Sequence, residues 1–141
     1  MPVSTLASVD WKLEVVVIPV SDADRAKAFY VDQVGFALDV DRQVSDEMRV
    51  VQTTPRGSAC SVTFGPGLSA MEPGSLKGLQ LVVADVEAAR AELAGRGVEV
   101  TAVRHLADDG WRDGPGGDWN SFIFFDDPDG NSWTVQQKPS S

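Results

Sequence analysis

The chain has 141 residues, of which 43% are hydrophobic, so it is long and apolar enough to form one domain with its own core. Its 21 acidic and 12 basic residues give a net charge of -9 at pH 7, which disfavours binding to nucleic acid or to an anionic membrane surface. No apolar stretch approaches the roughly 20 residues that cross a bilayer, and residues 1–10 lack the features of a signal peptide. A single cysteine, Cys60, cannot form an internal disulfide, so we expect a cytoplasmic protein.

In chain order, the first elements are a strand and a helix over residues 16–30, and their pattern returns at residues 79–93. Each segment has a strand rich in β-branched residues, an acidic helix start and an amphipathic helix. Asp22 and Asp85 occupy equivalent places and are N-cap candidates, because a short carboxylate accepts hydrogen bonds from the free amides of the first turn. The repeated pattern predicts two copies of one structural unit.

Turn residues repeat as well. Gly35 and Gly97 follow the two predicted helices, where glycine supplies a left-handed C-terminal cap. Residues 51–63 and 124–136 both read as strand, Pro-x-Gly turn, strand, which predicts two hairpins at matching places.

These elements together predict an α+β fold of two βαβββ modules. The first module spans about residues 12–65, the second about residues 77–137, and a linker rich in glycine and proline joins them over residues 66–76. Half a chain of this size buries too little surface alone, so we expect the modules to pack as one domain over residues 1–141. The alternative is an ordinary α+β sandwich without internal symmetry.

Two motifs carry a resemblance to a known family. Val-Ser-Asp-x-x-Arg-Ala-x-x-Phe-Tyr at residues 20–30 and Phe-x-Asp-Pro-Asp-Gly-Asn at residues 125–131 resemble the vicinal oxygen chelate superfamily, which includes glyoxalase I, extradiol dioxygenases and bleomycin-binding proteins. The resemblance implies two curled mixed sheets around a ligand cup, with the helices outside. It also implies a homodimer, and it leaves open whether one cup is made within a chain or across two chains. Fold alone does not fix the chemistry.

In metal-dependent members the resemblance places four ligands, one on the first and one on the last strand of each module, typically histidine, glutamine or glutamate. Those four positions are Val15, Ser61, Gly78 and Thr134. Valine and glycine offer no side-chain donor and neutral hydroxyls are poor ligands, so we expect no metal and no other cofactor. A divalent-metal site remains an alternative only if the alignment with the family is shifted by one or two residues, which would place Glu14 or Gln80 at a ligand position.

Strand alternation predicts the rest of the cup face. This face mixes apolar and hydrogen-bonding groups, which suits a small and mostly apolar ligand. The predicted ligand-binding residues on the strands are Val15, Val17, Ser61, Thr63, Gln80, Thr134 and Gln136. The alternative is that the polar members of this set face solvent.

After a predicted strand over residues 98–104, we expect a glycine-rich loop over residues 106–120. Trp111 and Trp119 in this loop offer flat apolar surface to an aromatic ligand if the loop is a lid, or they anchor the loop or a dimer interface. His105 lies just before the loop and its carboxylates, and it is the candidate catalytic base. The alternative is an ordinary surface histidine.

The function that these observations favour is a metal-independent protein that binds a small, partly aromatic molecule. One alternative is a metal-dependent lyase, isomerase or dioxygenase of the glyoxalase type. Another is a metal-free enzyme that uses His105 with a carboxylate of the acidic loop. In each case the expected partner is a small molecule.

Overall fold

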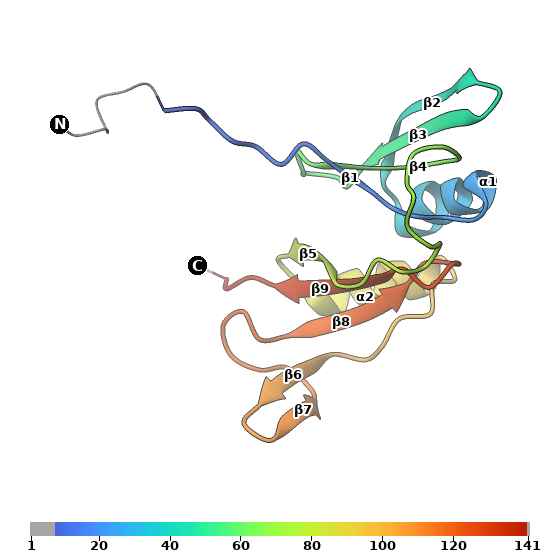
Figure 1. The fold of residues 1–141 in the computed structure, drawn as a ribbon. Coiled ribbons are helices and arrows are strands. Elements are labelled where there is room, and N and C mark those ends of the chain that lie inside the picture. Colours follow the sequence, from blue (N-terminus) through green and yellow to red (C-terminus); the bar gives the residue numbers. More distant parts are fainter. Residues whose placement is uncertain (1–7, 141) are drawn as a thin grey trace.

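A computed structural model describes residues 8–140 of the chain (Figure 1), so the two ends of the predicted domain, residues 1–7 and 141, lie outside the described residues. The elements in chain order are β1 (Val15–Val17), α1 (Ala23–Lys27), the π-helix η2 (Ala28–Val34), β2 (Ala37–Ser45), β3 (Met48–Thr54), β4 (Ser61–Phe64), β5 (Leu79–Val83), α2 (Val86–Gly95), β6 (Arg104–Ala107), β7 (Gly110–Asp113), β8 (Phe122–Asp126) and β9 (Ser132–Gln137). Between residues 8 and 140, no helix is both long enough and apolar enough to span a membrane.

The strands form two mixed sheets, which confirms the α+β class and the two-module architecture. Their orders are β1-β4-β3-β2 and β5-β9-β8-β6-β7, and the first strand of each module runs parallel to the last. The first sheet lies above the second in Figure 1, and β1 and β5 are edge strands in the two sheets.

The predicted helix caps are confirmed. Asp22 accepts a hydrogen bond of 3.1 Å from the amide of Arg25, and Asp85 accepts one of the same length from Ala88. Gly35 has a φ of +94°, in the left-handed region that glycine adopts without strain, and it ends η2. The first helix differs from the prediction because it widens into a π-helix after Lys27.

The predicted strand over residues 98–104 is wrong. The structure has only an isolated bridge there, between Val100 and Phe125, and β6 begins at Arg104. Val98 and Val103 are 6% and 5% exposed, so their apolar character reflects the packing of an irregular segment against the core.

The predicted loop over residues 106–120 is also wrong in its first half. It contains the end of β6 and all of β7, which pair as a hairpin and give the second sheet its fifth strand. His105 therefore lies in β6 and Trp111 in β7. The sequence concealed this hairpin because polar residues and glycines outnumber apolar ones along it, which is typical of loops as well as of exposed edge strands.

A single core joins the two modules. The Tyr30 ring is fully buried and lies 5.4 Å from the Phe64 ring and 5.8 Å from the Trp133 ring, measured between centroids. Phe29 contacts Phe125 in the same way at 6.2 Å. The two modules therefore bury their helix-covered faces against each other, and aromatic side chains supply much of the buried area.

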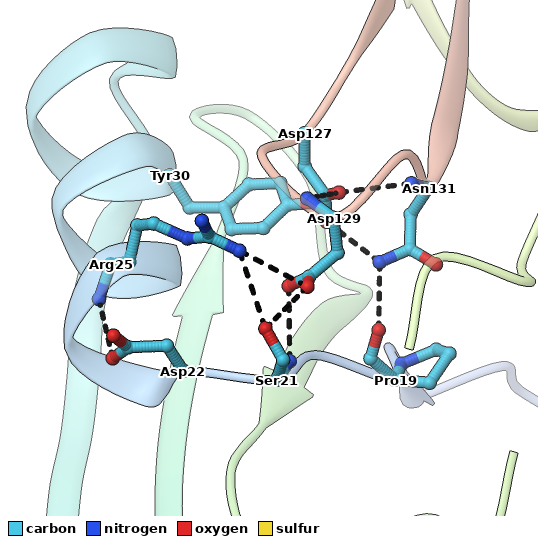
Figure 2. A network of polar contacts seen from close by, with 8 residues as sticks. All are labelled: Pro19, Ser21, Asp22, Arg25, Tyr30, Asp127, Asp129 and Asn131. Carbon is cyan, nitrogen blue, oxygen red and sulfur yellow. Dashed lines mark hydrogen bonds and ion pairs between the residues drawn. The ribbon is translucent and has the colours of Figure 1, made fainter. Parts of the chain in front are cut away.

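A buried polar network lies beside these rings and crosses between the modules (Figure 2). The Tyr30 hydroxyl donates to Asp127 at 2.7 Å and accepts from the indole N–H of Trp133 at 3.0 Å. The Asn131 amide donates to Asp127 and to the carbonyl of Pro19, both at 2.8 Å. Burial, and then the charge of Asp127, raise the pKa of Tyr30 well above its ordinary value, so the hydroxyl keeps its proton and stays a donor.

This network makes a prediction about stability. Asp127→Ala should lower the free energy of unfolding by about 3 kcal/mol or more, because buried donors lose their acceptor, and Tyr30→Phe should lower it by about 1–2 kcal/mol. Urea unfolding followed by tryptophan fluorescence measures both changes. Asp126→Ala is the matched control. Asp126 is the neighbouring residue and is exposed, so its loss should change the free energy of unfolding by less than about 0.5 kcal/mol. Equal effects at the two positions would contradict the role of the network.

Candidate ligand-binding site

The second sheet carries an aromatic platform on the face turned away from the core. Phe122 and Phe124 of β8 stack at 6.2 Å between ring centroids. The Trp111 ring of β7 stands on both with its plane nearly perpendicular, at 5.3 Å and 5.4 Å. Trp111 is 49% exposed, so a flat apolar ligand can reach this platform.

The sequence pattern predicted Trp111 as a ligand-binding residue, but it did not indicate the two phenylalanines. The strand reads Phe-Ile-Phe-Phe over residues 122–125, without the polar–apolar alternation that separates the two faces of a strand. Ile123 and Phe125 are buried in the core, whereas Phe122 and Phe124 are half-buried on the opposite face. The signal that could have found them is the register with Thr134, which was already assigned to the cup face.

Polar side chains lie beside the platform on the same face. Pairing places Gln80 next to Thr134 and Thr134 next to Phe124, so the structure brings together these predicted residues and the platform. Gln80 donates to Gln136 at 2.6 Å, and Gln136 donates to the carbonyl of Trp119 at 2.8 Å. The Gln136 side chain therefore ties the turn at Trp119, whose φ is +59°, to the sheet.

The other predicted strand residues lie on the first sheet. Val15 pairs with Ser61 and Val17 pairs with Thr63, so these four side chains share one face. Ser61 and Thr63 are 8% and 7% exposed, even though they lie on the face opposite Val62 and Phe64 of the core.

The two sets of predicted residues do not face each other within one chain. The core-facing sides of both sheets meet in a single core, so the opposite sides, which carry these residues, point away from each other. A cavity of about 190 Å³ lies between the modules, but Val82 is its only lining residue that belongs to the outward face of β5. Each chain thus presents two separate outward faces.

The four positions that the resemblance assigns to metal ligands do not hold side chains that suit a metal ion. Val15 and Ser61 are on one sheet, and Gly78 and Thr134 are on the other. Gly78 has a φ of +80°, which would strain any side chain placed there as a ligand. Among residues 8–140, no group of three or more histidine, cysteine, aspartate or glutamate side chains is arranged to hold a metal. The donor set therefore does not fit the metal chemistry of the superfamily.

His105 is half-buried in β6 and its Nδ1 atom lies 2.9 Å from the carbonyl oxygen of Gly114. This contact anchors the segment that follows β7. Among the described residues, no carboxylate forms a hydrogen bond or ion pair with His105, so the structure does not bring the predicted base together with an acidic partner.

Comparison with known proteins agrees with this architecture. The family model described as "Glyoxalase/Bleomycin resistance protein/Dioxygenase superfamily" matches residues 12–135. The chain belongs to this superfamily. No curated protein matches the chain.

Solved structures of bacterial proteins are similar to most of the chain. One is TnmS3, described as an antibiotic binding protein from Streptomyces sp. CB03234, with 35% identity, a TM-score of 0.75, and coverage of 94% of this chain and 100% of that chain. A glyoxalase/bleomycin resistance protein from the same organism has 38% identity, a TM-score of 0.70, and coverage of 89% and 100%. A superfamily member from Sphaerobacter thermophilus DSM 20745 has 28% identity, a TM-score of 0.72, and coverage of 92% and 98%.

The Gln136 contact leads to a prediction about local order. Gln136→Ala should raise amide hydrogen exchange in residues 114–120, because the turn loses the hydrogen bond that holds it to β9. The overall stability should fall by only about 0.5–1.5 kcal/mol. Gln52→Ala, on the outward face of the other sheet, is the control and should leave exchange in this segment unchanged. Unchanged exchange in Gln136→Ala would show that other contacts fix the turn.

Proposed function

We propose that this superfamily member binds a small, partly aromatic molecule on the outward sheet faces, without a metal and without turning it over. The observation that carries the proposal is the exposed platform of Trp111, Phe122 and Phe124 beside the Gln80–Gln136 pair. Ligand sites of this kind combine apolar and aromatic walls with a few placed hydrogen-bonding groups. The description of TnmS3 as an antibiotic binding protein supports an antibiotic-like ligand.

Binding is favoured over catalysis because the chain lacks an evident set of reacting groups on these faces, within the part that the structure describes. Neither Val15 nor Gly78 offers a metal donor, and among residues 8–140 no carboxylate bonds to His105 to orient it as a base. A general base needs a free nitrogen within reach of the substrate and is commonly oriented by a second group.

The complete site in this proposal belongs to a homodimer. The outward face of each sheet forms only half of the site, and nothing in its own chain covers that face among the described residues. A two-fold axis that places the first sheet of one chain over the second sheet of its partner closes two identical cups. Large apolar side chains on these outward faces are well exposed in one chain: Val15, Val40, Val82 and Trp111. Burial of such a surface stabilises an interface.

The ligand class also follows from charge. A net charge of -9 disfavours nucleic acid and anionic membranes as partners and suits a neutral or cationic small molecule. The cytoplasmic location stays a prediction that rests on the single Cys60.

A first experiment tests ligand binding. Isothermal titration with polycyclic aromatic antibiotics should give a saturable complex, and chromatography should recover the compound unchanged. Phe124→Ala should weaken the binding at least about tenfold, because the ligand loses an aromatic contact. Met71→Ala, an exposed apolar position in the linker, is the control and should bind like the wild type. Chemical conversion of the compound would replace the binding role with an enzymatic one.

A second experiment tests the dimer. Sedimentation velocity should show a dimer. Val82→Asp should shift the equilibrium toward monomer, because it places a charge on the outward sheet face that the proposed dimer buries. Met71→Asp also replaces an apolar side chain with a carboxylate, at a similarly exposed position in the linker, and this variant should remain dimeric. A monomeric wild type that still binds its ligand would contradict the shared cup.

A third experiment tests metal independence. Treatment with a chelator, or addition of zinc, nickel, manganese or iron, should leave both the unfolding temperature and ligand binding unchanged, because a metal that bound only the native state would raise stability by mass action. Elemental analysis of protein purified without chelator is the direct measurement. A bound ion that the protein needs for turnover would restore the alternative of a metal-dependent lyase, isomerase or dioxygenase.

A further inference from the structure

Three polar side chains form a line across the outward face of the first sheet. The Thr54 hydroxyl donates to the carboxylate of Asp39, which lies at the irregular point of β2. The same hydroxyl oxygen lies 2.7 Å from the hydroxyl oxygen of Ser61 on β4. The line therefore ends on a residue of the predicted ligand set.

The direction of these hydrogen bonds follows from the number of protons. The Thr54 hydroxyl has one hydrogen, and it uses this hydrogen in the bond that it donates to the Asp39 carboxylate. Thr54 then has only lone pairs left for Ser61, and Ser61 must donate to Thr54. The Ser61 oxygen thus offers acceptor lone pairs to any further partner and no proton.

A second polar atom on this face lacks a partner. The Thr63 hydroxyl has no hydrogen bond among residues 8–140, although the residue is only 7% exposed. A buried hydroxyl without a partner is destabilising, and a hydrogen bond from a ligand would remove part of that cost. Thr63 lies two residues after Ser61 on β4, so both side chains point to the same side.

We propose that Asp39, Thr54 and Ser61 form a polar subsite that selects ligands with an O–H or N–H donor, such as a phenol, an alcohol or an amine. This inference rests on the proposed binding function and names the ligand chemistry of the same site. Ser61 accepts a hydrogen bond from the O–H or N–H group of the ligand, and the Thr63 hydroxyl bonds a second polar group of the ligand. Asp39 and Thr54 are positioning residues, because they fix the direction in which Ser61 bonds.

The test compares two aromatic probes that differ only in this proton, 2-naphthol and 2-methoxynaphthalene. Isothermal titration of the wild type should show about tenfold tighter binding of the naphthol, which corresponds to one hydrogen bond of ordinary strength. Ser61→Ala should bring the two affinities to within about twofold, because the acceptor is removed.

Asp39→Asn tests the direction of the line. The carboxamide can donate a hydrogen bond to Thr54. The Thr54 hydroxyl can then donate to Ser61, and the Ser61 hydroxyl can donate to the ligand. The preference for the naphthol should therefore fall, mainly because the methyl ether binds more tightly. Asp46→Asn, in the turn between β2 and β3, removes the same charge and should keep the full preference. Thermal unfolding of each variant confirms that it is folded.

The outcomes separate this inference from the binding function. If Ser61→Ala and Asp39→Asn keep the tenfold preference while Phe124→Ala loses both probes, the subsite is refuted and the binding function stands. Equal affinities of the wild type for the two probes would likewise refute the subsite and leave the binding function in place. If the wild type binds neither naphthalene probe, the subsite is refuted, and the titration with polycyclic aromatic antibiotics alone decides the binding function.

Discussion

The buried carboxylate of Asp127 is the contact on which the arrangement of the chain depends. It is 5% exposed and accepts hydrogen bonds from Tyr30 of the first module and from Asn131 of its own turn. Asn131 in turn donates to the carbonyl of Pro19, back in the first module. A buried carboxyl group is stable only when its hydrogen bonds are satisfied, and the donors to Asp127 come from both modules. Aromatic packing around Tyr30 adds the apolar part of the same junction.

This junction also determines which faces of the two sheets stay outward. Because the helix-covered faces of both sheets are used to join the modules, the opposite faces are left outward and open. A repeat protein of this kind cannot close a cup with its own two modules while it keeps this core. The dimer in our proposal is thus a consequence of how the core was formed, since it brings together faces that one chain holds apart.

The outward faces of the two sheets carry different side chains, although both modules have the same order of elements. The second sheet supplies flat aromatic surface through Trp111 and Phe124, and the first supplies a directed line of oxygen atoms that ends at Ser61. In our proposal, a ligand held between these faces meets apolar surface on one side and a hydrogen-bond acceptor on the other. Affinity would come mainly from the aromatic half and discrimination between similar compounds from the polar half.

Local features could be predicted from the sequence, because each depends on a few neighbouring residues. The caps at Asp22 and Asp85, the left-handed Gly35 and the repeated hairpins follow from short-range chemistry, and strand alternation correctly grouped the residues of each outward face. The hairpin of β6 and β7 was missed because an exposed edge strand and a loop have similar compositions. Only the tertiary structure decided which faces were buried together, and it placed Asp39 against Thr54. Alternation says which side chains share a face but not what that face meets.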